Sequence, residues 1–152
     1  MTHEDSDNFK VFTVEEANAL VPWLDYQFGR MMMYMSRMEE TLQRLVQQGI
    51  EPSPTIVNVR KSDPAQIKRQ KRRLKKLITD VFDYYSSVQG AGTIIEDIST
   101  GTVSFYTYFG EHPVFLTWQF GERAVSWWHE LYEDSNERKP LPRGGSITGV
   151  IN

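Results

Sequence analysis

Near its C-terminal end the sequence gathers residue types that could perform metal or acid–base chemistry. The stretch TWQFGERAVSWWHELYED, residues 117–134, contains His129 and Glu122, and Asp97 precedes it. A histidine beside one or two carboxylates can bind a divalent metal ion or serve as a general acid–base pair. His129, Glu122 and Asp97 are therefore the candidate catalytic and metal-ligating residues, and we predict no organic cofactor.

The spacing of these residues leaves a structural role open. The chain has no cysteine and no H-E-x-x-H pattern. On a helix, His129 would lie one turn from Glu133 on a common face. In a strand, His129 would share a face with Trp127 and lose part of its hydration. A buried histidine of this kind commonly hydrogen-bonds to a carboxylate or a backbone carbonyl. The glycines lack nucleotide-binding spacing, and no serine has a nucleophile-elbow context, so neither of those site classes is supported.

A second candidate is the basic segment KRQKRRLKK, residues 68–76. On a helix it could contact the phosphate backbone of a nucleic acid. It could instead be an ordinary solvated face near Glu39 and Glu40, or it could bind an acidic surface of a second copy. The predicted contact residues are Lys68, Arg69, Arg72, Arg73 and Lys76.

Charge is unevenly distributed along the chain. Residues 64–88 carry seven Lys or Arg against two Asp, whereas residues 93–152 carry four against eight Asp or Glu. The net charge of the whole chain is −3, which argues against a dedicated nucleic-acid binder. Such asymmetry favours an interaction with a partner or with a second copy.

Hydrophobic spacing predicts two long helices. In FTVEEANALVPWL, Thr13 and Glu16 have the capping-box relation, and apolar residues then recur at helical spacing over residues 14–48. Pro22 should kink or restart this helix. Asp63 is the expected N-cap of a second helix over residues 64–88.

After the second helix the period of the apolar residues changes to two. TIIEDIS, TVSFYTYF, PVFLTWQF and AVSWWHEL, within residues 93–131, are separated by turn residues and predict three or four antiparallel strands. The fold class is therefore α+β, with a long antiparallel helical hairpin packed on a small β-meander. Aromatic side chains on the sheet extend the predicted interaction surface: Tyr106, Tyr108, Phe115 and Trp128.

The length and the termini indicate one domain. We expect a flexible N-terminus over residues 1–10, a single domain over 11–141 and a flexible tail over 142–152. The acidic N-terminus lacks the features of a signal peptide, and no apolar run could span a bilayer. We therefore expect a cytoplasmic protein with no membrane association.

Several ordered motifs resemble the bacterial family catalogued as domain of unknown function 2203. They are FTVEEANALVPWL, IEDISTGTVSF, VFLTWQFGERAVSWWHEL and RKPL, and they cover roughly residues 11–141. Where the family's motif has a lysine, an aspartate and a cysteine, this chain has Glu96, Ser104 and Thr117. The resemblance implies a shared fold and brings no established activity. The residues it carries over are Asp97, Glu122, Trp128 and His129.

Together these features predict a small homo-oligomeric interaction or regulatory protein that has an unknown protein partner and no catalysis of its own. The alternative is a divalent-metal-binding protein, or a metal-dependent or acid–base enzyme, centred on His129, Glu122 and Asp97. A further alternative is nucleic-acid binding through the basic second helix.

Overall fold

The computed structural model describes residues 10–142 and divides the chain into two compact units. The helical unit is Gly29–Ser86. The sheet unit, as described, comprises residues 10–28 and 87–142. Apart from Lys10 and Pro142, the predicted flexible ends lie outside the described residues.

The first helix, α2 (Val14–Gln47), begins at the predicted capping box. The Glu16 N–H donates to Thr13 Oγ1, and the Thr13 N–H donates to Glu16 Oε1, both at 3.0 Å. These two hydrogen bonds satisfy backbone donors that a helix N-terminus leaves without intrahelical partners. Of the two predicted effects of Pro22, a kink or a restart, the restart is wrong, because the helix continues through Pro22 as one element.

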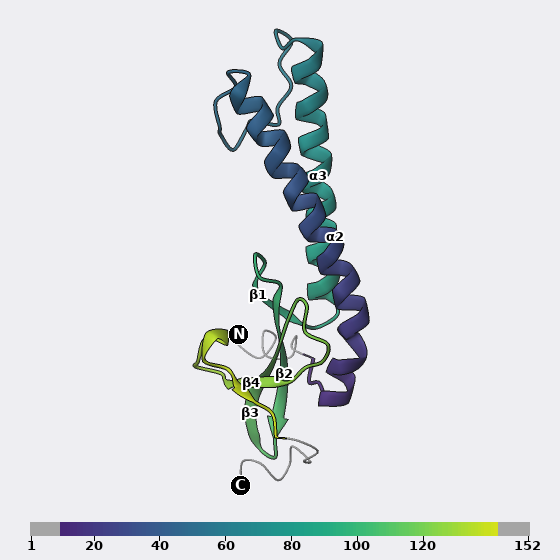
Figure 1. Cartoon of the computed structure of the whole chain (residues 1–152), viewed down its shortest axis with the longest axis vertical. Coiled ribbons are helices and arrows are strands. Elements are labelled where there is room, and N and C mark those ends of the chain that lie inside the picture. Colours follow the sequence, from purple (N-terminus) through teal and green to yellow (C-terminus); the bar gives the residue numbers. More distant parts are fainter. Residues whose placement is uncertain (1–9, 143–152) are drawn as a thin grey trace, which may run out of the picture. The chain divides into compact units, whose positions relative to one another are not determined.

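In the helical unit, α2 and α3 (Ala65–Gly90) run side by side as the predicted antiparallel hairpin (Figure 1). The Tyr34 and Tyr84 rings stack with their centroids 5.7 Å apart, and Arg30 Nε donates to the Tyr84 hydroxyl at 3.3 Å. Nearer the connection between the helices, a hydrophobic cluster packs the two helices and the connecting segment together. Its buried members are Leu45, Ile56, Ile67 and Leu74.

Asp63 does not cap α3 as predicted. Its carboxylate Oδ2 accepts from the Arg60 N–H at 2.7 Å and from Lys71 Nζ at 2.8 Å. Lys71 is buried within the basic segment and also donates to the Asn58 carbonyl at 3.0 Å. Burying an ammonium group requires such partners. Asp63 therefore ties the connecting segment to α3.

The sheet unit contains five strands in the order β1-β2-β3-β4-β5, and all neighbours are antiparallel. This confirms the meander and the α+β class, with one or two strands more than predicted. The extra strand, β5, has only two residues and therefore no alternation to recognise. The strands are β1 (Ile94–Asp97), β2 (Thr102–Phe109), β3 (His112–Gln119), β4 (Trp127–Glu130) and β5 (Lys139–Pro140).

The first part of α2 covers one face of this sheet. Phe28 lies with its ring centroid 6.0 Å from that of Trp118, and both side chains are fully buried. Asn18 Oδ1 accepts from the Val125 N–H at 2.7 Å. This contact fixes the segment that leads into β4. We call this face of the sheet the inner face and the opposite one the outer face.

Within the described residues, neither long helix has an apolar stretch sufficient to cross a membrane.

Candidate functional site

His129 lies on β4, as the strand interpretation of its motif predicted. It is paired in register with Phe115 on β3, and the two rings lie 5.4 Å apart on the outer face. Only 1% of His129 is exposed. Because side chains alternate along a strand, Trp127 shares this face whereas Trp128 points to the inner one.

The surroundings of His129 define which nitrogen is available for chemistry. Nδ1 lies 2.7 Å from the carbonyl oxygen of Glu130, which can only accept, so Nδ1 carries a proton. Nε2 is buried, forms no hydrogen bond and lies 3.4 Å from Glu96 Oε1. Burial acts to lower the pKa of His129. The Glu96 carboxylate and the Glu130 carbonyl favour the charged imidazolium more strongly, so the pKa of His129 is raised above its usual value.

Glu96 is the site residue that sequence reasoning missed. Its Oε1 accepts a hydrogen bond from Ser104 Oγ at 2.7 Å. Burial acts to raise the pKa of Glu96, but His129 and Ser104 outweigh it and the pKa is lowered. A β-bulge separates Ile95 from Asp97 in the β1–β2 register. Glu96 lies on β1, Ser104 on the next strand and His129 on β4, so only the pairing register could have identified their contacts.

Thr117 adds another buried polar group to the outer face. It is paired with Ser104 across β2 and β3, and it lies diagonally from His129 across β3 and β4. Thr117 is fully buried, and its Oγ1 has no hydrogen-bond partner. Glu96, Ser104, Thr117 and His129 thus form a polar cluster spanning four strands, which we call the polar cluster.

The structure does not bring Asp97 and Glu122 to His129 as one ligand set. Asp97 Oδ1 accepts from the Ser99 hydroxyl at 2.6 Å and from the Ser99 N–H at 2.9 Å, and these bonds lower the pKa of Asp97. Glu122 accepts from Arg138 at 2.8 and 3.1 Å and from the Gln119 N–H at 2.7 Å. In the described part of the chain, no three His, Asp or Glu side chains converge to hold a metal ion.

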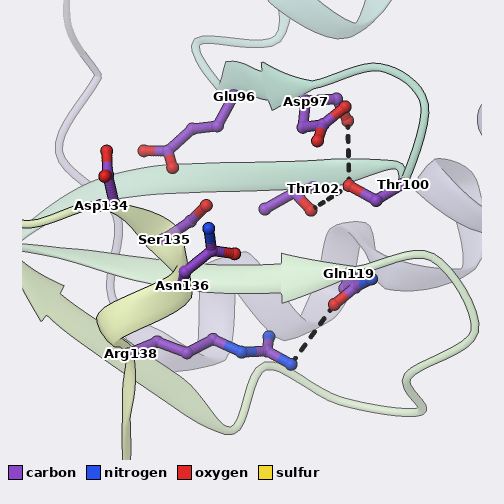
Figure 2. A pocket seen from close by; sticks show the side chains of 9 residues that line it. All are labelled: Glu96, Asp97, Thr100, Thr102, Gln119, Asp134, Ser135, Asn136 and Arg138. Carbon is purple, nitrogen blue, oxygen red and sulfur yellow. Dashed lines mark hydrogen bonds between the residues drawn. The ribbon is translucent and has the colours of Figure 1, made fainter.

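Glu96 is the member of the polar cluster that also lines a pocket of about 410 Å³ (Figure 2). Glu96 and Asp97 line it from β1, and Asp134 and Ser135 line it from the segment that follows β4. Arg138 also lines it, and its guanidinium is already paired with Glu122. The pocket is polar and acidic, and its volume falls in the range of ligand-binding pockets.

The profile of the family described as Uncharacterized conserved protein (DUF2203) matches residues 10–141. The chain belongs to this family. No curated protein and no solved structure matches it. In this DUF2203 protein, Ser104 and Thr117 face each other in the polar cluster, and Glu96 accepts a hydrogen bond from Ser104.

The predicted aromatic interaction residues of this DUF2203 protein lie on two faces of the sheet. On the outer face, the Tyr106 ring lies 5.4 Å from Tyr108 and 6.0 Å from Phe115, and 43% of Tyr108 is exposed. Trp128 lies on the inner face, where it packs on Phe109 with 5.1 Å between ring centroids. Only the first three can contribute to a common surface.

Within residues 10–142, neither Glu39 nor Glu40 forms an ion pair with a basic residue of α3. Lys68, Arg69, Arg72 and Arg73 form no ion pair within residues 10–142, and the three arginines are exposed. Lys76 pairs with Asp80 in the next turn of α3 at 3.3 Å. The helical unit as a whole has twelve Lys or Arg against six Asp or Glu, a net charge of +6. The described sheet unit has four against eleven, a net charge of −7.

Proposed function

We propose that this protein is a cytoplasmic homo-oligomeric interaction module that catalyses no reaction itself. In this proposal the helical unit of one copy binds the sheet unit of another. The separation of charge between the two units, +6 against −7, carries the proposal. Complementary charge steers association and fixes the register of the partners.

The arginines on α3 suit this role. Arg69, Arg72 and Arg73 are exposed and have no carboxylate partner in their own chain, among the residues described. A guanidinium can bind a carboxylate through two parallel hydrogen bonds and can also stack on an aromatic ring. These groups are therefore available for pairing with a second copy.

The outer face of the sheet unit offers complementary groups. Tyr106, Tyr108 and Phe115 form a continuous ring cluster there, and the exposed Glu111 follows in the β2–β3 turn. Tyrosine and arginine are enriched in protein interfaces, and arginine binds favourably over aromatic rings. A contact between two different surfaces of the same protein is head-to-tail, so it forms a ring or an extended chain of copies.

Sedimentation velocity over a range of salt concentrations tests this proposal. We expect self-association at about 50 mM salt that weakens at least roughly tenfold by about 500 mM, because salt screens exposed charges. Arg72→Glu should weaken it similarly at low salt. Arg123→Glu is the matched control, because it makes the same charge change at an exposed arginine of the sheet unit. A monomer at every concentration, or association that neither salt nor Arg72→Glu affects, would exclude the proposal.

The same unpaired arginines favour nucleic-acid binding as a second candidate function. Fluorescence anisotropy with single-stranded RNA and with duplex DNA distinguishes it from self-association. Phosphate contacts would give an affinity that falls steeply with salt and a shallower salt dependence for Arg72→Glu. The absence of binding at low salt would exclude this candidate and leave the self-association proposal intact.

A further inference from the structure

We propose that the polar cluster is a binding site for a divalent cation of the zinc type, with His129 Nε2 and the Glu96 carboxylate as its protein ligands. Imidazole nitrogen together with carboxylate oxygen suits zinc and related transition metals. The residues involved are distinct from those of the proposed oligomer contact, and neither proposal requires the other.

The first support is the orientation of His129. Its Nδ1–H donates to the Glu130 carbonyl at 2.7 Å, so Nε2 is the nitrogen that can offer a lone pair. Metal-binding histidines are typically oriented in this way by a backbone carbonyl or a carboxylate on the other ring nitrogen. The ring is 1% exposed and lies against Phe115. Nε2 therefore faces Glu96, and Glu96 forms the side of the site that borders the pocket.

The second support is the distance from Nε2 to Glu96 Oε1. At 3.4 Å it exceeds the roughly 2.7–2.9 Å of a charge-assisted hydrogen bond, and Nε2 forms no hydrogen bond. Two ligands bound to one zinc ion at about 2.0–2.1 Å in tetrahedral geometry are about 3.3–3.4 Å apart. A cation can thus bind both atoms with little movement of either.

The third support is an unpaired hydroxyl on the same face. Thr117 Oγ1 is buried without a hydrogen-bond partner, diagonally across from His129. Glu96 also lines the 410 Å³ pocket, which can supply water to the remaining coordination positions. No third His, Asp or Glu joins these two ligands within residues 10–142. The site is therefore an open one, weaker than a closed four-ligand structural zinc site.

Cobalt is a suitable probe, because tetrahedral Co²⁺ absorbs visible light and zinc displaces it. We expect the full-length, metal-free protein to bind one equivalent of Co²⁺ with a visible absorption band, and Zn²⁺ to remove that band. Glu96→Gln and His129→Gln should each weaken binding at least about tenfold. His112→Gln and Glu122→Gln are matched controls, because each removes one imidazole or one carboxylate outside the cluster, and both should leave affinity unchanged.

A gain-of-affinity variant keeps the test decisive if His129→Gln fails to fold. Ser104 Oγ lies 2.7 Å from Glu96, so Ser104→Asp adds a second carboxylate beside the site. We expect Ser104→Asp to bind Co²⁺ at least about tenfold more tightly, since charge and ligand number both rise. Circular dichroism of each variant establishes that it is folded.

Three results would overturn the inference. They are the absence of stoichiometric Co²⁺ or Zn²⁺ binding by the wild-type protein, undiminished binding by folded Glu96→Gln, and no gain in Ser104→Asp. In the first case, His129 and Glu96 form only an internal ion pair. Sedimentation of the metal-free wild-type protein and of metal-free Arg72→Glu tests the oligomer proposal separately.

Discussion

Lys71 and Asp63 form a buried ion pair in the helical unit, with 2.8 Å between Nζ and Oδ2 and side-chain exposures of 4% and 8%. Lys71 lies in the middle of the basic segment, whose three arginines are exposed. Lys71 also donates to the Asn58 carbonyl, which comes from the segment that connects the two long helices. One lysine of the basic segment is therefore structural, whereas the arginines beside it remain available to partners.

This pair predicts a dependence of stability on pH. The Lys71 hydrogen bond, followed by that of the Arg60 N–H, holds the pKa of Asp63 below its usual value. A carboxylate with a lowered folded-state pKa stabilises the fold above its unfolded pKa of about 3.9, and that contribution is lost as pH falls through the folded pKa. We expect Asp63→Asn to destabilise the protein at pH 7 and to lose less stability on acidification than the wild type.

Urea denaturation of Asp63→Asn at pH 7 and at about pH 3 measures both effects. Asp80→Asn is the control, because it breaks the exposed pair with Lys76, which contributes at most about 1 kcal/mol. Equal acid dependence in Asp63→Asn and wild type would contradict the prediction.

Two glycines near the end of α3 should respond oppositely to alanine. Gly92 has φ +92°, and an added Cβ would lie 2.6 Å from the Lys10 Cβ, so Gly92→Ala should cost at least about 1 kcal/mol. Gly90 is the last residue of α3 and has open space around it, so Gly90→Ala should be neutral or stabilise by up to about 1 kcal/mol. Thermal unfolding of the two variants compares their stabilities directly. An equal loss of stability in both would contradict the argument that the positive φ of Gly92 disfavours alanine.

The capping box at the start of α2 predicts a measurable loss of stability when Thr13 is replaced. Thr13→Ala removes the acceptor for the Glu16 N–H and should destabilise the protein by about 0.5–2 kcal/mol. Thr13→Ser retains the hydroxyl and should retain most of the stability. Chemical denaturation of both variants checks this, and an equal loss in the serine variant would show that the methyl group matters more than the cap.

The packing of α2 on the inner face of the sheet predicts the largest loss of stability among these variants. Phe28 is fully buried against Trp118, so Phe28→Ala should cost about 3–5 kcal/mol. Phe82 on α3 is 64% exposed, and Phe82→Ala should change stability by no more than about 0.5 kcal/mol. Denaturation followed by tryptophan fluorescence measures both changes. A loss in Phe28→Ala no larger than that in Phe82→Ala would contradict this account of the core.

Local patterns in the sequence predicted the two long helices and the first four strands. The capping relation of Thr13 and Glu16, the helical spacing of apolar residues and the later alternation identify two helices and a meander, because each pattern depends on residues close together in the chain. The sequence also identified His129 as a strand residue beside a tryptophan. The short β5 has no such local pattern, and pairing with β4 alone makes it a strand.

The contacts between side chains of different strands became evident only in the folded structure. His129 and Glu96 are brought together by strands distant in sequence, and Asp97 and Glu122 instead bind Ser99 and Arg138. The sequence likewise did not distinguish the buried Lys71 from its exposed neighbours. Local patterns specify the conformation of each segment, whereas contacts between side chains depend on the strand register and on the packing of segments that are far apart along the chain.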